Sequence, residues 1–279
     1  MDGTFKTCPT IFDQIYTVHV KLRSNKTVPV VYALLPNRSA STYRRLLAII
    51  DAAIDGHAPG VIHLDFELTM IQELQSVFPA AQILGCNFHL NQCIWRHIQR
   101  ENELCELYKN DDDFNLHFRM FAALAFVPAN QVRQVFQSLI TSSFIQNNMA
   151  ILRTFITYFE TTWVGTDYRG PRYKIDWWNS FEATLRGMAR TNNQTEGWHS
   201  AFAGRVGCAH PGFHSFLTHL RAEQSLTEFT VVNSEAQADV AVSRRVYRDR
   251  QKRLKSLAES YGDLQSLRYL GIVALNISF

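Results

Sequence analysis

The sequence predicts an α/β fold in which a mixed sheet is followed by a long helical segment. Residues 15–22 and 28–35 are runs of β-branched and aromatic side chains separated by a turn-like stretch, and such runs are typical of neighbouring strands. Short apolar runs at 60–66 and 81–85 alternate with segments of helical spacing. From about residue 100 to residue 190, helical spacing and aromatic side chains dominate.

The local residues predict each element in turn. We expect residues 5–10 to form part of a strand that precedes the antiparallel pair. A helix capped by Ser41 or Thr42 follows, because apolar residues recur there at helical spacing. The next apolar run is predicted to be a buried strand that ends near Asp65, and Pro79 stops the helix after it. Three strands followed by β-α-β-α is the order of an RNase H-like domain with a mixed sheet.

The predicted organisation is a core with an α-helical insertion between Asp65 and Glu196. Residues 1–100 form the first part of the RNase H-like core, and residues 101–190 form the insertion. Residues 191–279 form the remainder of the core, with a helix around Glu196 and a basic helical segment at the C-terminal end.

Composition favours a folded protein and leaves its partners open. Of the 279 residues, 46% are hydrophobic and 19% are charged, which is enough for a sizeable core. No apolar run is long enough to span a bilayer and the first residues lack the layout of a signal peptide, so we expect a soluble intracellular protein with no membrane partner. The net charge of +3 neither demands nor excludes nucleic acid. Five cysteines spread over the chain favour reduced thiols over a disulfide framework.

Three acidic side chains are candidates for metal-dependent chemistry. Asp65 ends a predicted buried strand, and functional groups of α/β sheets gather at such strand ends. Asp2 starts the first strand, and Glu196 lies far along the chain near a predicted helix. Magnesium prefers carboxylate oxygens, and two ions about 4 Å apart can activate an attacking oxygen and stabilise a leaving one. Each acid alone also has an ordinary explanation, as a solvated terminus, a strand-end turn or a helix-terminal charge.

A second group of residues suggests a zinc site, although one ion cannot bind all of its members. Four ligand-type side chains follow one another at helical spacing: Cys86, His89, Cys93 and His97. The 11 residues from the first to the last would span about 16 Å of helix, which is too long for one ion. A structural half site of Cys86 and His89 remains, with candidate partners further along the chain: Cys208, His210 and His214. A packed cysteine and a hydrogen-bonded histidine are the favoured interpretation over Zn²⁺ binding.

A basic segment near the C-terminal end could track a phosphate backbone. Residues 244–255 hold seven basic side chains and one acid. The candidate DNA contacts are Arg244, Arg245, Arg248, Arg250, Lys252 and Arg253. An ordinary solvated helix face is the alternative explanation.

Several short blocks of this sequence resemble the transposases of Mutator-like elements, the MULE transposase domain family. The blocks are Asp2-Gly-Thr-Phe-Lys6, Leu35-Pro-Asn-Arg-Ser39, Asp65-Phe-Glu67, Cys86-Asn-Phe-His89 and Asn192-Asn-Gln-Thr-Glu-Gly-Trp-His199. Each block alone is unspecific, but together they follow the family's order over nearly the whole chain. The Cys-x-x-His element between the second aspartate and the distant glutamate is the most specific part of the resemblance.

The resemblance implies a DDE-type transposase with an RNase H-like fold and a nuclear role in DNA transposition. It implies that Asp2, Asp65 and Glu196 are catalytic and bind two Mg²⁺ or Mn²⁺ ions. By that likeness, water hydrolyses the phosphodiester at the end of the mobile element, and the freed 3′-hydroxyl attacks target DNA. The implied partners are double-stranded DNA and a second copy of the chain. His199 and Trp198 are further candidates for contact with DNA or the active site.

The main alternative is a catalytically inactive, transposase-derived protein that binds DNA or regulates. The sequence begins one residue before Asp2, which predicts a frayed first strand and favours a truncated or domesticated copy without an upstream DNA-binding module. Retention of all three acids favours the enzyme. An unrelated hydrolase or oxidoreductase is disfavoured, because no Gly-x-Ser-x-Gly or Gly-x-Gly-x-x-Gly motif follows a predicted strand.

Overall fold

The computed structural model is a mixed α/β protein, as the sequence predicts, and its chain folds as two units. The described residues are 1–236, 245–277 and 279. The unit that carries the three-stranded sheet, named here the sheet unit, comprises Met1–Ile83 and Asn192–Ser243. The other, named here the helical unit, comprises Leu84–Thr191 and Arg244–Phe279. All three predicted acidic residues therefore belong to the sheet unit.

Three antiparallel strands open the sheet unit in the order of the chain. They are β1 (Asp2–Thr4), β2 (Gln14–Lys21) and β3 (Thr27–Leu35). The predicted antiparallel pair is thereby confirmed as β2 and β3. In the register of β1 with β2, Asp2 lies opposite Thr17 and Gly3 lies opposite Tyr16.

The prediction of a strand over residues 5–10 is wrong, because the chain turns there. The Cys8 amide donates to the Phe5 carbonyl, and the Phe12 amide donates to the Pro9 carbonyl. These short-range bonds use backbone groups that a strand would offer to its neighbour, and Pro9 has no amide hydrogen to offer. The first strand is therefore limited to β1, which starts at Asp2.

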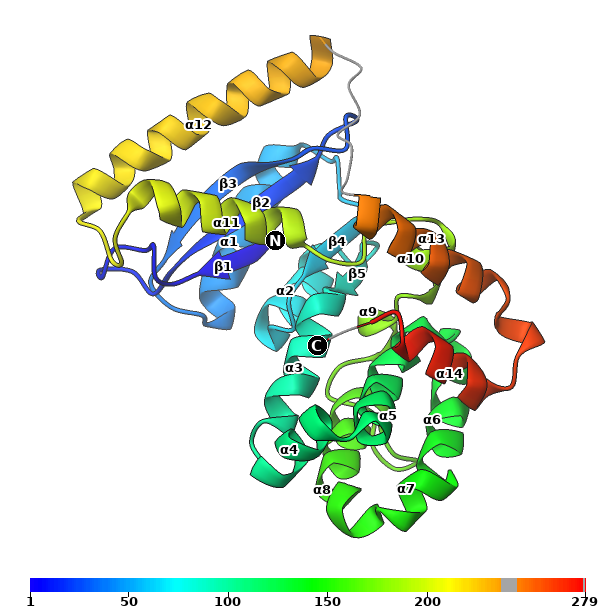
Figure 1. Cartoon of the computed structure of the whole chain (residues 1–279). Coiled ribbons are helices and arrows are strands. Elements are labelled where there is room, and N and C mark those ends of the chain that lie inside the picture. Colours follow the sequence, from blue (N-terminus) through cyan, green and yellow to red (C-terminus); the bar gives the residue numbers. More distant parts are fainter. Residues whose placement is uncertain (237–244, 278) are drawn as a thin grey trace. The chain divides into compact units, whose positions relative to one another are not determined.

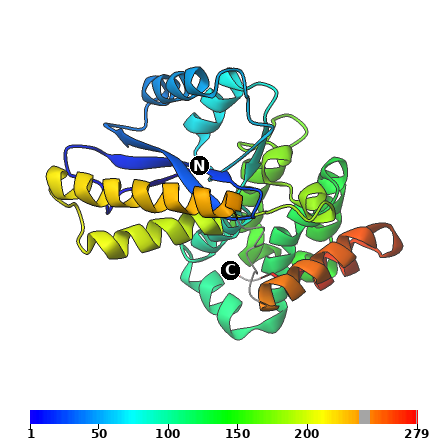
Figure 2. The same cartoon turned by 90° about the horizontal axis from the view of Figure 1, so that it is seen from above.

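Helices cover both faces of the three-stranded sheet. The helices of the sheet unit are α1 (Ala40–Ile54), α2 (Leu68–Val77), α11 (Asn193–Val206) and α12 (Phe213–Ala236). α1 lies on one face, and α11 and α12 lie on the other (Figures 1 and 2). Because successive strand residues face opposite sides, Ile15 packs in a buried cluster with Phe202 and Phe216, whereas Tyr16 lies beside Tyr43 of α1.

The elements around Asp65 agree with the sequence prediction. β4 (Val61–Leu64) ends directly before Asp65, and it pairs with β5 (Gln82–Gly85) in a two-stranded sheet. α2 ends at Val77, two residues before Pro79, as expected. The start of α1 is the exception, because its N-cap is Ser39 and not Ser41 or Thr42. The Ser39 hydroxyl accepts the Thr42 amide at 3.3 Å and so satisfies one of the free amides at the helix start.

The helical unit is built around an aromatic core. Its helices are α3 (Asn87–Ile98), α4 (Asn102–Asn110), α5 (Asp112–Ala123), α6 (Val132–Ile140), α7 (Ser143–Asn147), α8 (Met149–Phe159), α9 (Ile175–Trp178), α10 (Phe181–Leu185), α13 (Arg245–Glu259) and α14 (Ser266–Ala274). Shorter turns occupy Leu124–Phe126, Ala129–Gln131, Glu160–Val164 and Tyr261–Asp263. The fully buried rings include Phe118, Phe121, Phe136, Phe155 and Phe159. Residues 191–279 are predicted to form the remainder of the core, whereas α13 and α14 belong to the helical unit, in which α14 packs on α5 and α6.

None of the described helices is both long and apolar enough to cross a membrane.

Candidate active site

The sheet unit brings the three predicted acidic residues together from distant parts of the chain. Asp2 lies in β1, Asp65 directly follows β4, and Glu196 lies in the first turn of α11. The charges of Asp65 and Glu196 both act on the carboxyl group of Asp2. Asp2 and Asp65 are 63 residues apart in the sequence, and Asp65 and Glu196 are 131 apart, yet all three lie in the same unit.

Asp2 is held in place by the backbone of its own strand and of β2. Asp2 pairs with Thr17 and is 8% exposed, so the predicted fraying of the first strand is wrong. The Gly3 amide donates to Asp2 Oδ1 at 2.9 Å, and the Thr17 hydroxyl donates to the Asp2 carbonyl at 3.2 Å. The Met1 amino group donates to the His63 carbonyl at 2.7 Å, which ties the start of β1 to β4.

Gly3 is the residue that lets β1 lie close to β2. A Cβ atom at this position would lie 2.2 Å from Oε1 of Gln14 and 3.1 Å from the Tyr16 ring. The first of these distances is shorter than any normal contact, so a larger residue would force the Gln14 side chain to move. Gly3 thus allows the close packing of β1 on β2, next to the acidic side chain of Asp2.

The acidic centre is electrostatically unfavourable as it stands. Burial and the neighbouring Asp65 charge raise the pKa of Asp2 to about 7, with a smaller contribution from Glu196. The positive amino terminus and the Gly3 amide oppose this shift. Burial also raises the pKa of Glu196. A divalent cation would remove the repulsion among these acids and supply the positive charge that they lack.

Two neutral histidines line the Asp2 side of this centre. His199 Nε2 lies 3.6 Å from Asp2 Oδ2 and 3.3 Å from the Thr17 hydroxyl. His19 Nε2 lies 3.1 Å from the same hydroxyl. Burial lowers the pKa of His199 to about 4 and that of His19 to about 3. Because both imidazoles are neutral at pH 7, the His199 contact with Asp2 is a polar contact and not an ion pair.

A second polar network adjoins Asp65, and the sequence reasoning missed most of it. The Tyr43 hydroxyl donates to Glu67 Oε1 at 2.5 Å and accepts from Gln14 Nε2 at 2.9 Å. Burial raises the pKa of Glu67, and the charge of Asp65 adds to this shift. The signal in the sequence was the alternation of side chains along β2. It puts Gln14 and Tyr16 on the face that packs against α1.

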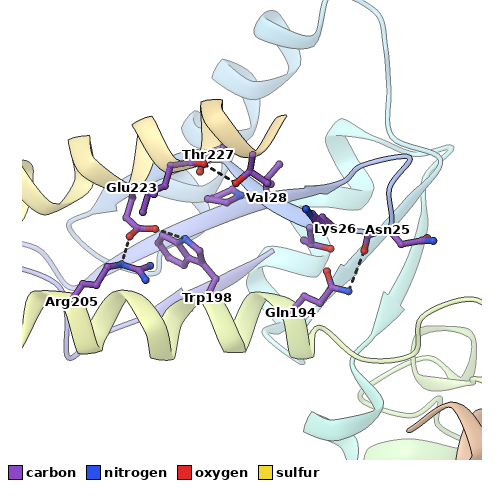
Figure 3. A pocket seen from close by; sticks show the side chains of 12 residues that line it. Asn25, Lys26, Val28, Gln194, Trp198, Arg205, Glu223 and Thr227 are labelled. Carbon is purple, nitrogen blue, oxygen red and sulfur yellow. Dashed lines mark hydrogen bonds and ion pairs between the residues drawn. The ribbon is translucent and has the colours of Figure 1, made fainter. Parts of the chain in front are cut away.

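Trp198 serves the packing of α11 and also lines a cavity. Its ring stacks on Phe202 at 5.0 Å between centroids, and its Nε1 donates to Glu223 Oε2 at 3.0 Å. Arg205 forms an ion pair with the same carboxylate (Figure 3). The cavity holds about 450 Å³ and lies among the start of β3, α11 and α12. Asp2, Asp65 and Glu196 do not line it, so it is separate from the acidic centre.

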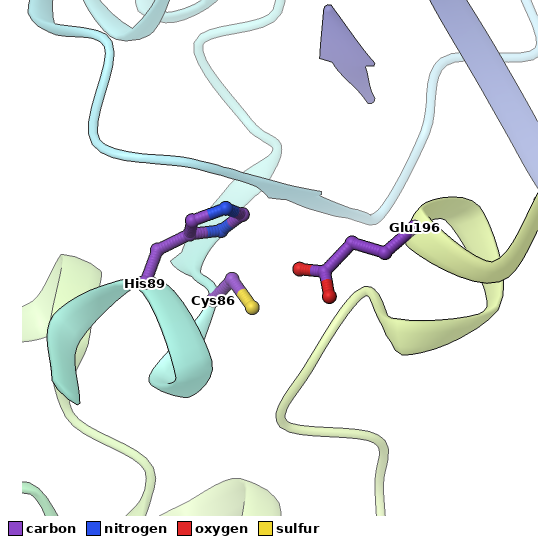
Figure 4. Close-up of side chains that lie close together, drawn as sticks. All are labelled: Cys86, His89 and Glu196. Carbon is purple, nitrogen blue, oxygen red and sulfur yellow. The ribbon is translucent and has the colours of Figure 1, made fainter. Parts of the chain in front are cut away.

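The predicted Cys-His half site lies at the start of α3. Cys86 is fully buried at the N-cap, and His89 is half-buried in the first turn (Figure 4). Glu196, also drawn there, belongs to the sheet unit, whereas these two residues belong to the helical unit. The His97 ring stacks on Tyr158 at 3.7 Å, so that histidine is occupied by packing. Zinc usually takes four ligands, and Cys86 with His89 supplies two.

The other candidate partners of that half site have roles of their own. His210 Nδ1 lies 3.1 Å from the Cys8 carbonyl, and its amide donates to the Lys6 carbonyl. Cys208 and His214 are exposed. Zn²⁺ binding therefore stays an untested prediction.

The basic segment forms α13, whose apolar edge is buried and whose basic side chains are exposed. Leu254 and Ala258 are 2% exposed. The exposed candidates for DNA contact are Arg248, Arg250, Lys252 and Arg253. Arg244 lies outside the described residues, and only the backbone of Arg245 is described. This arrangement suits both of the predicted explanations, a phosphate-binding face and a solvated one.

These features define a class of protein, a mixed α/β chain with a centre of three carboxylates on its sheet unit, of which Asp2 is buried. Residues 1–93 match the family model of the MULE transposase domain, which supports membership of the family that the sequence blocks resemble. The match includes Asp2, Asp65, Cys86 and His89, whereas Glu196 lies beyond it. It indicates a transposase-related function and an interaction with DNA in general. Neither the comparison with curated proteins nor that with solved structures gave a match.

Proposed function

We propose that this chain is a DDE-type DNA transposase catalytic domain in which Asp2, Asp65 and Glu196 bind two divalent cations. The observation that carries the proposal is the convergence of these three acids, from three distant segments, on the buried carboxyl group of Asp2. Structural carboxylates are usually buried with a cationic partner. A centre where acids oppose one another is typical of a functional site.

The arrangement of strands supports an RNase H-like core for this domain. β1, β2 and β3 are antiparallel neighbours, and the bond from the Met1 amino group to the His63 carbonyl joins β1 to β4. β4 pairs with β5 in a second, two-stranded sheet. Helices alone follow from Asn87 to Leu185, where an insertion is expected between Asp65 and Glu196.

The donor set fits Mg²⁺ or Mn²⁺ better than a softer metal. The three side chains offer only carboxylate oxygens, which hard cations prefer. When bound, such cations would supply positive charge that stabilises the attacking and the leaving oxygen of a phosphodiester. The raised pKa of Asp2 supports this fit, because a cation would restore the ionised carboxylate.

The residues of the chain would hold the ligands and the DNA in place. The Gly3 amide donates to the Asp2 carboxyl group, and the Thr17 hydroxyl donates to the Asp2 carbonyl. Neutral His199 contacts the same carboxyl group. In the proposed reaction a water oxygen attacks phosphorus, and the bond from phosphorus to the 3′-oxygen breaks. Water gives up a proton and the 3′-oxygen gains one. The freed 3′-hydroxyl then attacks a phosphodiester of target DNA, so one ester bond replaces another.

The exposed basic residues of α13 are the proposed phosphate contacts in the helical unit. Seven cations in twelve residues would release counterions on binding DNA, so affinity should fall steeply with salt. A nuclear role in DNA transposition is part of the same proposal.

Metal binding by the whole chain tests the proposed function. Calorimetry should show Mn²⁺ binding to the unchanged protein and to Asp51→Asn, an exposed acid of α1 that serves as the control. Asp65→Asn and Glu196→Gln should lose at least one of the bound ions, since each removes a ligand. The same two variants should fail to nick supercoiled plasmid DNA in Mn²⁺ while they keep the fold.

The outcomes separate an enzyme from an inactive relative. Equal nicking by Asp65→Asn and the unchanged protein would refute the assignment of the three acids. A folded protein that binds DNA but binds neither Mn²⁺ nor Mg²⁺ would support the regulatory alternative. Binding of Mn²⁺ that Asp65→Asn removes, together with nicking, would support the transposase.

A further inference from the structure

The Tyr16 hydroxyl is buried without a hydrogen-bond partner among the described residues. Tyr16 lies in β2 opposite Gly3, and the residue is 1% exposed. Its ring lies beside Tyr43 at 5.8 Å between centroids. No acceptor or donor contacts its hydroxyl in the described chain. Buried hydroxyls are nearly always bonded, so an exception needs an explanation.

The charges of three acids act on this hydroxyl. Burial raises the pKa of Tyr16 well above its ordinary value, and the charges of Asp65, Glu67 and then Asp2 raise it further. Among these acids, Asp65 acts most strongly. A protonated tyrosine hydroxyl is a hydrogen-bond donor.

The neighbouring Tyr43 shows what a satisfied hydroxyl looks like in the same region. It donates to Glu67 at 2.5 Å and accepts from Gln14 at 2.9 Å. Of two tyrosines whose rings adjoin, one hydroxyl bonds two side chains, and the other has no partner among the described residues. Asp65, whose charge acts most strongly on Tyr16, is the carboxylate to which we assign the bond.

We propose that Tyr16 is a positioning residue whose hydroxyl donates a hydrogen bond to the Asp65 carboxylate when the acidic centre holds a divalent cation. This inference rests on the proposed function. A carboxylate that binds a cation keeps lone pairs on its far side, and a donor there fixes its orientation and strengthens binding. Without the cation, the hydroxyl stays buried and unbonded, which destabilises the metal-free protein.

The variant Tyr16→Phe separates this role from simple packing, because it removes only the oxygen. We expect its Mn²⁺ affinity, measured by calorimetry, to fall about 10- to 100-fold. In metal-free buffer its unfolding midpoint should be unchanged or higher, because an unsatisfied buried hydroxyl has been removed. The matched control is Tyr32→Phe in β3, whose hydroxyl meets Thr227 at 3.5 Å and on which Glu223, outside the acidic centre, acts. That control should bind Mn²⁺ as the unchanged protein does.

The unchanged protein gives a second measurement. A new hydrogen bond from a tyrosine alters its ultraviolet absorption, so Mn²⁺ should produce a tyrosine difference spectrum that is absent from Asp65→Asn. A difference spectrum that Tyr16→Phe also removes would support the proposal.

Each contrary outcome has a distinct meaning. If Mn²⁺ binds to the unchanged protein and not to Asp65→Asn, but Tyr16→Phe binds as tightly as the unchanged protein, only the role of Tyr16 is refuted. A lower midpoint of Tyr16→Phe with unchanged affinity would make Tyr16 a packing residue. If the folded, unchanged protein binds no Mn²⁺, both the proposed function and this inference fail.

Discussion

In the helical unit the buried aromatic rings pack favourably on one another, whereas in the sheet unit several acids act on one another with charges of the same sign. Phe155 meets Phe118 and Phe121 edge-to-face at 4.9 and 5.0 Å between ring centroids, a favourable geometry. Asp2 is also buried, but its nearest charged neighbours include the acids Asp65 and Glu196. Conflict of that kind lowers stability, and it supports the proposed metal-binding role of these acids.

The sheet unit itself shows that a buried carboxylate need not be a conflict. Glu73 accepts from Arg44 through both of its oxygens at 2.9 Å. Glu223 is 3% exposed and is bonded by Arg205 and Trp198. These acids have cationic partners, whereas the charges around Asp2 are mostly of its own sign. The conflict is therefore specific to the acidic centre and is not a general property of this unit.

The largest effect on stability is expected in the aromatic core. Phe155→Ala should lower the free energy of unfolding of the helical unit by about 3–5 kcal/mol, because it leaves a cavity among fully buried rings. Denaturant titration followed by fluorescence would measure this loss. Phe229→Ala is the control, since this ring of α12 is 68% exposed and its removal should change stability by less than about 0.5 kcal/mol. A loss below about 1 kcal/mol for Phe155→Ala would contradict the account of the core.

At the acidic centre a substitution is expected to raise the free energy of unfolding, by less than Phe155→Ala lowers it. The pKa of Asp2 is about 7 in the folded protein against 3.8 for an ordinary aspartate. Between these pH values the folded state binds more protons than the unfolded state, so the free energy of unfolding falls as pH rises. Asp2→Asn removes this dependence and should stabilise the metal-free protein by about 2–4 kcal/mol at pH 8. The gain should vanish near pH 4, and thermal unfolding across this range in a chelator would measure it.

The control for this sign change is a buried acid with a cationic partner. Glu73→Gln removes the charge that Arg44 binds, so it should destabilise by about 1 kcal/mol at pH 8. Two variants that each neutralise one buried acid are thus expected to shift stability in opposite directions. Destabilisation by Asp2→Asn at pH 8 would show that the acidic centre is not a source of conflict.

The sequence predicts most of the fold because its signals are local. The antiparallel pair, the strand before Asp65 and the helices after residue 87 follow from strand runs and helical spacing. The failure at residues 5–10 also has a local cause, because turn bonds around Pro9 outweigh a short apolar pattern. The placement of α14 on α5 could not be predicted, because helical spacing shows that a face is buried but not what buries it.

Some residues of the candidate site could be predicted from the sequence, and others could not. The three acids stand out in the sequence because they belong to short blocks with a recognisable order. Tyr16, Tyr43 and Gln14 do not stand out, because a tyrosine in a strand normally indicates only a half-buried surface. Their involvement depends on the contact of β2 with α1 and on the register that puts Gly3 opposite Tyr16. Such contacts exist only once the strands are paired.

The smallest expected effect tests whether the sheet unit can be stabilised without disturbing its acidic centre. Gly204 and Gly207 lie at the end of α11, and neither has an atom within 4 Å of where a Cβ would be. Gly204 is inside the helix, so Gly204→Ala should raise the free energy of unfolding by about 0.5–1 kcal/mol. Gly207 is the C-cap with φ of 73°, so Gly207→Ala should lower it by about 1 kcal/mol. Thermal unfolding would measure both changes, and Mn²⁺ affinity should stay the same in each, since Glu196 lies two turns or more away along the helix. A change in affinity with Gly204→Ala would mean that α11 must deform to bind the cation. The acidic centre would then be coupled to the C-terminal end of that helix.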